Sequence, residues 1–452
     1  MEAIPASPVD RFERPSSRLD AWRIRAAARS YQRLGWNPLV SEIAGLLLLA
    51  RCVMPGASPA AQLARLLVAG RRLRTAGLRS AVRRLLVPWL ANQRVDVFRE
   101  QHIGWDYYRE TFGGLSSPGL TCSLLLKAPG PGGEKGVLYS SFEYNWMRLV
   151  ANCDARRVLR DYFLVGASSW SPPDYSAFAS LSGLSPDPVF IGISNPVDVE
   201  QYRLFEPHVR AVPLMASSWI NPNRFKPKPY RERQIDILMV ANWHRFKRHW
   251  LLFEALRRMD RGLRIMLIGS NGDGRTERHI RTEMRAFGVR QDVELRTDID
   301  VDQVYAYECD AKLGAILSRR EGSCVAVAEC LFADTPVVMM KDAHVGSKAF
   351  INEQTGALST RSRLASDLSR LLERPTPLSP REWAKGNIDC FRSSQALNDQ
   401  LRAYSDAVGL PWTRDITPLE WHLVPKYARP EDGARMRSAV EMLRSDYGVN
   451  LV

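Results

Sequence analysis

Short apolar runs alternate with longer amphipathic segments between residues 235 and 373, and this alternation limits the possible folds more than any other feature. Each run has the length and β-branched content of a buried strand, and each following segment has the period of a helix. Such alternation with short connections predicts a doubly wound sheet, which binds ligands beyond the carboxyl ends of its strands. Strands are expected at 235–242, 263–269, 292–297, 312–318 and 335–340, and helices at 250–259, 276–287, 301–308, 323–332 and 361–373.

A second α/β pattern precedes the first. Apolar runs at 136–142, 162–168 and 188–194 are each followed by a helical or loop segment, which is typical of a mainly parallel sheet. We therefore expect an α/β fold with two Rossmann-like domains that face a cleft. The expected parts are a basic, mostly helical extension (1–100), an N-terminal α/β domain (101–215), a proline-rich linker (216–234), a second Rossmann-like domain (235–375) and a C-terminal extension that packs back on the N-terminal domain (376–452).

The composition is that of an ordinary globular protein, with 45% hydrophobic and 25% charged residues in a chain of 452. No apolar run reaches the roughly 18 residues of a membrane span, and the first residues lack the pattern of a signal peptide. Seven dispersed cysteines without metal-ligand spacing predict reduced thiols and a cytoplasmic location. The frequent arginine, alanine and proline indicate a bacterial chain.

The positive charge is concentrated at the start of the chain. The net charge is +14, and residues 1–100 hold 17 arginines, no lysine and 7 acidic residues. Segment 71–90 predicts an interfacial helix on an anionic membrane surface, and the alternative is a surface helix whose apolar face packs on the protein. A nucleic-acid partner is not expected, because no recognition motif accompanies the charge. The apolar face of this segment would hold Leu73, Leu78, Val82, Leu85, Leu86 and Trp89.

Two glutamates, Glu321 and Glu329, flank the start of one predicted helix. Glu321 is expected in the loop before that helix, and Ser323 is expected to be its N-cap. The N–H groups at a helix N-terminus favour phosphate, and Gly322 allows a ligand to approach the backbone. A ligand with a sugar, a diphosphate and a ribose in that order fits this arrangement. The alternative is that Glu321 is a solvated loop residue and Glu329 lies on the polar edge of an ordinary helix. The spacing of the two glutamates, taken alone, favours this alternative.

Two other loops at the same sheet edge offer groups for such a ligand. Arg245, Lys247 and Arg248 follow the strand at 235–242 and can neutralise a diphosphate, although they also fit a solvated basic loop. Gly269 begins a glycine-rich turn after the next strand, which is weak evidence alone.

Together these motifs resemble the "glycosyl transferases group 1" family, whose members are retaining glycosyltransferases with the GT-B fold and a Glu-x7-Glu signature. EGSCVAVAE (321–329) resembles that signature, and ADTPVVMM (333–340) is similar to the strand that follows it in the family. SKAFINEQTGAL (347–358) is similar to the Thr-Gly segment, and SSWINPNRFKP (217–227) to the entry into the donor domain. The resemblance covers 213–375, is only architectural for 120–212 and is absent from 1–100.

The resemblance implies a role for each matching residue. Glu321 would contact hydroxyls of the donor sugar, with Gly322 and Ser323 near the sugar and the distal phosphate. Glu329 would hold the ribose hydroxyls, and Lys247 would bind the diphosphate and act in catalysis with Glu321.

The chain departs from the family pattern at several places. The arginine usual five residues before the lysine is Asn242, for which Arg245 or Arg248 is a possible substitute, and the glycine usual before Thr-Pro is Asp334. The acceptor side has only the loop 140–146 and His208 as candidates, and His208 also fits an ordinary surface histidine.

The implied activity is transfer of a sugar, expected to be a hexose, from a nucleoside-diphosphate sugar to a hydroxyl on a glycan or lipid-linked acceptor. Bacterial polysaccharide, glycolipid or cell-envelope glycan synthesis is the expected setting, at the inner face of the cell membrane. No cofactor or metal is expected, since the aspartates of TDIDVD (297–302) fit helix capping better than a metal site. The alternative is a glycosyltransferase-like binding protein that has lost catalysis and acts at a membrane surface.

Overall fold

The computed structural model describes residues 17–30, 37–52, 56, 58–90, 94–102, 119–272, 274–373 and 378–452. The chain divides into two compact units. Unit 1 contains Met1–Arg33 and Pro222–Asp389, and unit 2 contains Leu34–Asn221 and Cys390–Val452. The predicted basic extension is therefore shared between the units, and the predicted C-terminal extension belongs mainly to unit 2.

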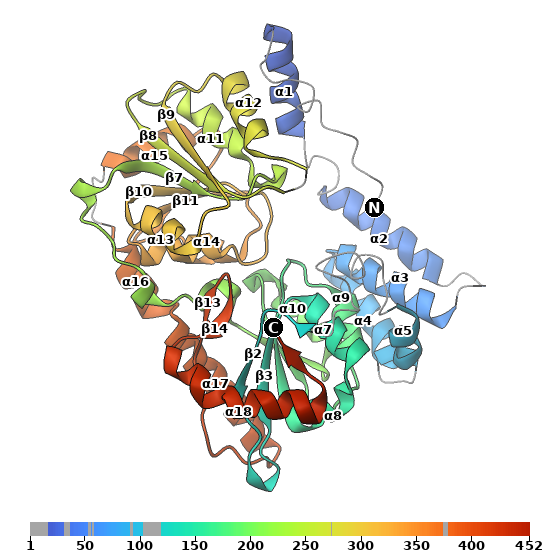
Figure 1. Ribbon diagram of the computed structural model, residues 1–452. Coiled ribbons are helices and arrows are strands. Elements are labelled where there is room, and N and C mark those ends of the chain that lie inside the picture. The colour runs from blue at the N-terminus through green and yellow to red at the C-terminus, as the bar shows by residue number, and fades with distance from the viewer. Residues whose placement is uncertain are drawn as a thin grey trace. The chain divides into compact units, whose positions relative to one another are not determined.

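Unit 1 is built on a six-stranded sheet with the order β12-β11-β10-β7-β8-β9 (Figure 1). All its strand pairs are parallel. The direction of winding reverses between the neighbours β7 and β10, so the crevice beyond their carboxyl ends is the topological switch point. The strands are β7 (Ile235–Val240), β8 (Arg264–Gly269), β9 (Asp292–Thr297), β10 (Ala311–Ile316), β11 (Val337–Met340) and β12 (Gly356–Ser359).

Helices cover both faces of this sheet, which explains why its central strands are continuous apolar runs (Figure 1). Helices α11, α12 and α15 lie on one face, and α13 and α14 lie on the other. Helix α1 packs on α12 through Ile24 and Ala286. The helices are α1 (Arg18–Ser30), α11 (His249–Leu256), α12 (Glu277–Phe287), α13 (Val301–Cys309), α14 (Val325–Phe332), α15 (Leu364–Glu373) and α16 (Pro380–Asn387).

Unit 2 contains a five-stranded sheet with the order β2-β3-β4-β5-β6. Its edge strand β2 is antiparallel to β3, and the other pairs are parallel. The strands are β2 (Ser123–Lys127), β3 (Gly136–Ser141), β4 (Tyr162–Ala167), β5 (Val189–Gly192) and β6 (Val209–Val212). The expected α/β class with two Rossmann-like sheets and an N-terminal helical region is confirmed.

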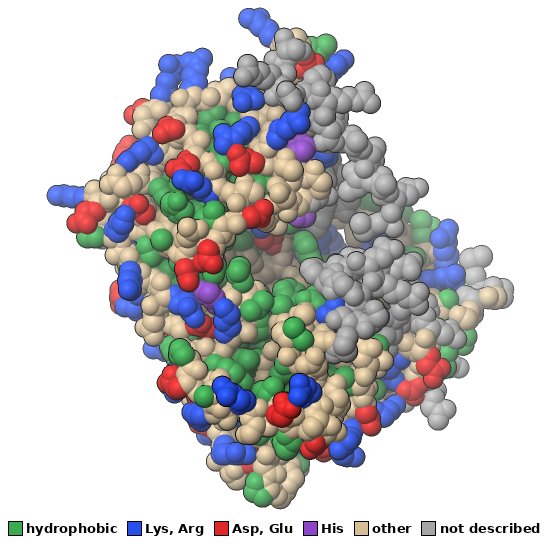
Figure 2. Space-filling view, in the orientation of Figure 1, with side chains coloured by type: hydrophobic (Ala, Val, Ile, Leu, Met, Phe, Trp, Pro, Cys, Tyr) green, Lys and Arg blue, Asp and Glu red, His purple; other side chains and the backbone are tan. Residues whose placement is uncertain are grey.

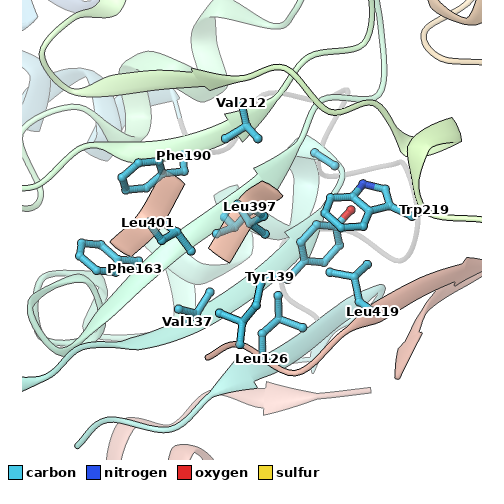
Figure 3. Packing of buried hydrophobic residues seen from close by; sticks show 13 residues of the cluster. Leu126, Val137, Tyr139, Phe163, Phe190, Val212, Trp219, Leu397, Leu401 and Leu419 are labelled. Carbon is cyan, nitrogen blue, oxygen red and sulfur yellow. The ribbon is translucent and has the colours of Figure 1, made fainter. Parts of the chain in front are cut away.

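The end of the chain completes the core of unit 2. Leu397 and Leu401 of α17 (Cys390–Ala407) pack against Phe163 and Phe190 of the sheet (Figure 3). A hairpin of β13 (Leu419–His422) and β14 (Val424–Tyr427), then α18 (Pro430–Tyr447) and β15 (Asn450–Leu451), follow α17. Strand β15 pairs with β1 (Gly119–Leu120). The remaining sheet helices are α7 (Glu143–Asn152), α8 (Ala155–Asp161), α9 (Tyr175–Leu181) and α10 (Val199–Tyr202).

Helices α2 (Pro38–Cys52), α3 (Pro59–Arg72), α4 (Ala76–Leu90) and α5 (Arg94–His102) form a helical layer of unit 2. Helix α3 contacts α2, α4, α5 and α9. In α4 the side chains of Val82, Leu86 and Leu90 are buried, as is Leu73 just before it. Most of the apolar face of segment 71–90 therefore packs on the protein, whereas Leu85 is 49% exposed, and the interpretation of this segment as the interfacial helix is not supported.

Candidate functional site

The loops after β7 and β10 are joined at the switch point of unit 1. The backbone N–H of Arg319 donates to the carbonyl of Phe246 at 2.9 Å, which links the end of one strand to the end of its neighbour. Because both strands run in the same direction, their following loops meet at the same sheet edge. This edge holds Lys247 on one loop and Glu321 on the other.

Lys247 and Glu321 form a direct ion pair. The ammonium nitrogen lies 2.7 Å from Oε2 of the carboxylate, and the two side chains are only 11% and 12% exposed. Burial alone would lower the pKa of Lys247, but the neighbouring charge of Glu321 outweighs it and raises this pKa. The structure thus brings together the two residues expected from the sequence to be catalytic, with the lysine held as a cation.

Arg248 has a structural role that the sequence did not reveal. Its φ of 55° lies in the left-handed region and directs the side chain under the loop after β10. The guanidinium donates to the carbonyls of Leu317 at 2.6 Å and Ser318 at 3.0 Å, and pairs with the carboxylate of Asp342 at 3.1 Å. These bonds join the ends of β7, β10 and β11. The guanidinium donors of Arg248 are thus engaged within the protein, and its binding of the diphosphate stays a prediction.

The start of α14 differs from expectation. The helix begins at Val325, and its N-cap is Cys324 with a φ of 55°, so Ser323 is not the cap. The segment before it runs beside the loop after β11. Gly322 accepts from the N–H of Gly346 at 2.8 Å, and Ser323 accepts from the N–H of Ser347 at 3.1 Å. These bonds fix the backbone of the expected sugar and phosphate site just before the helix N-terminus.

Glu329 lies in the second turn of α14 and is 8% exposed. Burial raises the pKa of Glu329 to about 7, against a smaller opposing effect of its hydrogen bond with Tyr305. Glu308 of the neighbouring helix α13 is fully buried. Its burial, together with the charge of Glu329, raises the pKa of Glu308 well above the ordinary range. Tyr305 and Glu308 were not expected, because within a predicted helix nothing marked them as neighbours of Glu329.

Gly269 allows two other loops to meet. A Cβ at this position would clash with the carbonyl of Ala241 and lie 2.9 Å from the ring of Trp243. The absence of a side chain at Gly269 leaves room for the indole of Trp243 at the end of β8. This packing is sufficient to explain a glycine at this position. Asn242, where the resemblance leads one to expect an arginine, lies directly before this indole.

Buried polar atoms without a partner occur in these loops. Asn242 Oδ1, Trp243 Nε1 and Ser347 Oγ make no hydrogen bond to any residue that the structure describes. Such atoms are rare in native proteins and call for an explanation. Two of them follow β7 and the third follows β11, so they lie at the same sheet edge as the Lys247–Glu321 pair. An edge with a buried cation, carboxylates and unused polar atoms suits a polar ligand with negative charge.

This part of the chain also matches known sequences. Residues 221–386 match the family model described as Glycosyl transferases group 1. The match contains the whole sheet of unit 1 and none of the sheet of unit 2. It supports a glycosyltransferase domain in unit 1. No curated protein matches the sequence.

Solved structures of other proteins share part of the fold. They include the pneumococcal O-GlcNAc transferase GtfA in complex with UDP and GlcNAc, which has 15% identity and a TM-score of 0.43 over 58% of this chain and 54% of that chain. Sucrose-phosphate synthase from Thermosynechococcus elongatus has 16% identity and a TM-score of 0.45 over 60% and 74% of the two chains. The Anabaena protein HepE in complex with UDP has 13% identity and a TM-score of 0.46 over 59% and 78%. The similarity thus spans about half of the pneumococcal protein's length.

The carboxyl edge of the unit 2 sheet also carries a buried carboxylate. Glu143 begins α7 after β3, and it accepts from Ser168 Oγ at 3.0 Å and from the N–H of Ser169 at 3.0 Å. Burial raises the pKa of Glu143 despite these bonds. The candidate loop 140–146 therefore lies at this edge. His208 precedes β6 at the opposite edge and accepts from the N–H of Gly183, so it is an unsuitable acceptor-side base.

Among the described residues no group of three or more His, Cys, Asp or Glu side chains is placed to hold a metal ion. In the TDIDVD segment, Asp300 caps α13 by accepting from the N–H of Asp302 at 2.8 Å. The capping interpretation of Asp300 thus agrees with the structure, whereas metal-independent catalysis stays a prediction.

Proposed function

We propose that the chain is a retaining glycosyltransferase that moves a sugar, expected to be a hexose, from a nucleoside-diphosphate sugar to a hydroxyl acceptor. The observation that carries the proposal is the Lys247–Glu321 ion pair at the switch point of the unit that matches the family model. In such sheets ligands bind at this place, and a cation beside a helix N-terminus suits a diphosphate. We further propose synthesis of a bacterial polysaccharide, glycolipid or cell-envelope glycan as the setting.

Each group has a distinct task in this reaction. The bond between the anomeric carbon and the diphosphate oxygen breaks while a bond from that carbon to the acceptor oxygen forms. The proton of the acceptor hydroxyl passes to the leaving diphosphate, on which negative charge develops. Lys247 is placed to neutralise this charge, together with the N–H groups at the start of α14. The lysine ammonium attracts phosphate, and the carboxylate of Glu321 beside it accepts hydrogen bonds from hydroxyls. A bound donor would therefore place its phosphate beside Lys247 and its sugar hydroxyls beside Glu321.

Glu329 is suited to bind ribose hydroxyls in its ionised form. A carboxylate accepts hydrogen bonds from both hydroxyls of a ribose, and a protonated carboxyl loses part of that capacity. Its raised pKa implies that donor binding strengthens as the pH rises through about 7. We propose that no metal takes part, since Lys247 and the helix N-terminus supply the positive potential at the diphosphate.

The decisive experiment is a panel of UDP-, GDP- and ADP-sugars, with donor hydrolysis and thermal stabilisation of the full chain as readouts. Hydrolysis of one donor that is lost in Glu321→Gln and Lys247→Met would support the proposal. The variant Lys312→Met is the matched control, because Lys312 forms an ion pair of the same length with Asp236 at the opposite sheet edge. Absence of both stabilisation and hydrolysis with every donor would contradict it.

A binding protein without turnover is the second candidate. Asn242 stands where the resemblance leads one to expect an arginine, and Arg248 is engaged by Asp342 and two carbonyls. Stabilisation by one nucleotide-sugar without hydrolysis or transfer to any glycan acceptor would favour this candidate. Restoration of turnover in Asn242→Arg would then identify the missing charge as the cause.

No helix in the described part of the chain is long and apolar enough to cross a membrane. We propose a cytoplasmic site of action at the inner face of the cell membrane, where lipid-linked acceptors are available.

A further inference from the structure

Helix α2 exposes a continuous stripe of large apolar side chains. Their spacing along the sequence places them on one face of the helix. Scattered apolar residues are normal on a protein surface, whereas a continuous patch marks an interaction site. The stripe consists of Leu39 (67% exposed), Val40 (44%), Ile43 (48%), Leu46 (43%) and Leu47 (62%).

The other side of α2 is fixed to the protein. A Cβ on Gly45 would lie 2.8 Å from the side chain of Leu73, so the helix approaches its neighbours closely here. Near the start of the helix, Ser41 Oγ donates to the carbonyl of Arg72 at 2.9 Å. At its end, Cys52 Sγ donates to the carbonyl of Gln62 at 3.6 Å. These contacts hold α2 in one orientation, with the stripe on the side of the helix opposite α3.

Arginines lie at both ends of the stripe. Arg51 follows Leu47 by one helical turn and is exposed, and Arg65 donates to the carbonyl of Arg51 at 3.1 Å. At the other end Arg74 is exposed, and its backbone N–H donates to Glu42 at 2.7 Å. Glu42 is the single acidic residue between 37 and 90 in the sequence. By contrast, both charge signs are interspersed over the face shown in Figure 2.

We propose that α2 binds the surface of an anionic phospholipid bilayer, with its apolar stripe among the acyl chains and its flanking arginines at the lipid phosphates. The 15 residues of the helix extend about 22 Å, which is less than the ~30 Å of a bilayer core. The helix therefore lies in the plane of the interface. This inference does not depend on the proposed glycosyl transfer.

Charge and area favour a bilayer over a second copy of the chain. In a symmetric dimer through the stripe, Arg51, Arg65 and Arg74 of one copy would face the same residues of the other. The stripe also holds only five residues, well below the roughly 20–30 residues a side of a stable interface. Anionic lipid removes the repulsion and covers the apolar side chains.

Flotation of the full chain with vesicles tests the inference. Vesicles of phosphatidylcholine alone are compared with vesicles that also contain about 30% phosphatidylglycerol, which supplies the negative surface potential. We expect binding to the anionic vesicles, and a loss of at least about tenfold in partitioning for Leu39→Gln/Leu47→Gln. The matched control, Val408→Gln/Met442→Gln, changes two exposed apolar residues elsewhere in unit 2 and should bind like the parent chain.

A charge variant separates the two contributions. Arg51→Gln/Arg74→Gln should weaken binding to anionic vesicles about tenfold and reduce its salt dependence. Equal binding of the Leu39→Gln/Leu47→Gln variant and the parent chain would overturn the inference. A parent chain that does not bind anionic vesicles would also overturn it, including a parent chain that dimerises through the stripe. Since these assays contain no sugar donor, their failure leaves the proposed function untouched.

Discussion

The ammonium group of Lys247 lies 2.7 Å from the carboxylate of Glu321, although 74 residues separate them in the sequence. The chain passes through β8, β9 and β10 before it returns to the neighbouring loop. A buried ion pair is weak evidence for stability, because desolvation offsets the attraction between the charges. Its position at the switch point agrees with the donor-binding role proposed for the pair.

A double-mutant cycle on Lys247 and Glu321 should distinguish function from stability. Each single change, Lys247→Met or Glu321→Gln, leaves an unpaired buried group and should lower the free energy of unfolding by about 3–5 kcal/mol. The double variant should lose less than the sum by about 0.5–3 kcal/mol, as measured by chemical unfolding. Turnover should nevertheless fall about 100- to 1000-fold in all three variants.

The corresponding cycle on Lys312 and Asp236 is the control for this prediction. That pair also spans 2.7 Å between β10 and β7, but it lies near the amino ends of these strands. It should show coupling in unfolding and parent-like turnover. Equal losses of turnover in both cycles would mean that the Lys247–Glu321 pair acts only through stability.

Glu329 should make unit 1 less stable as the pH rises, which is the opposite of the usual effect of a buried, ion-paired carboxylate. Its folded-state pKa of about 7 lies above the 4.5 of an ordinary glutamate, so the folded chain holds a proton that the unfolded chain has released. Stability should therefore fall as the pH rises from about 4.5 to 7. Glu329→Gln should remove this decline and raise the melting temperature at pH 8, while it weakens nucleotide-sugar binding. Thermal unfolding across this range and donor titration measure the two effects.

Glu308→Gln provides the comparison for Glu329. Burial and the charge of Glu329 raise the pKa of Glu308 well above its ordinary range, so this variant should also flatten the pH dependence. Because Glu308 is 0% exposed, the change should leave the hydroxyl-binding carboxylate of Glu329 available and preserve donor binding. Loss of donor binding in both variants would indicate a general collapse of α13 against α14.

The sequence predicted the sheet of unit 1 well because its central strands are mostly buried runs, although the edge strand β9 buries only Leu295. The run at 292–297 coincides with β9, and 235–242 and 263–269 differ from β7 and β8 by one or two residues. Strand β12 (Gly356–Ser359) was missed, since it is a short edge strand with three half-buried residues and no apolar run. The elements after residue 376 were also missed, because their apolar residues face a core formed far away in the sequence.

The site was predicted as far as strand order allows. Loops after adjacent parallel strands must meet, so Lys247 and Glu321 could be placed at one edge. The role of Arg248 could not be predicted, because its partners are two backbone carbonyls and Asp342, which no sequence pattern relates to it. The cap at Cys324 likewise depends on a positive φ that cysteine seldom adopts.

Gly269→Ala should disturb the donor loops through packing alone. The added methyl group would clash with the carbonyl of Ala241 and press on Trp243. We expect a loss of about 1–3 kcal/mol in the free energy of unfolding, and weaker donor binding as the loop with Asn242 shifts. Gly386→Ala is the control, because a Cβ there meets nothing within 4 Å and alanine favours the helix α16. It should be neutral or stabilise by up to about 1 kcal/mol.

The ion pair of Lys127 and Glu134 should set the acid stability of unit 2. The charges lie 2.6 Å apart with side chains 2% and 0% exposed, and Glu134 also accepts from the N–H and hydroxyl of Thr413. Burial opposes ionisation, but these bonds outweigh it and lower the pKa of Glu134 to about 2. The stabilisation is present above the ordinary pKa of about 4.5 and is lost as the pH falls through about 2.

Lys127→Met should therefore lower the free energy of unfolding at pH 7 by about 3–5 kcal/mol, because it leaves the carboxylate of Glu134 buried without its cation. The loss should shrink as the pH falls from about 4.5 towards 2 and the carboxyl becomes neutral. Arg402→Ala breaks the pair with Asp415, whose side chains are 43% and 57% exposed, and should change stability by at most about 1 kcal/mol. Unfolding of the full chain at several pH values measures both, and a pH-independent loss in Lys127→Met would assign it to packing against Trp412 instead.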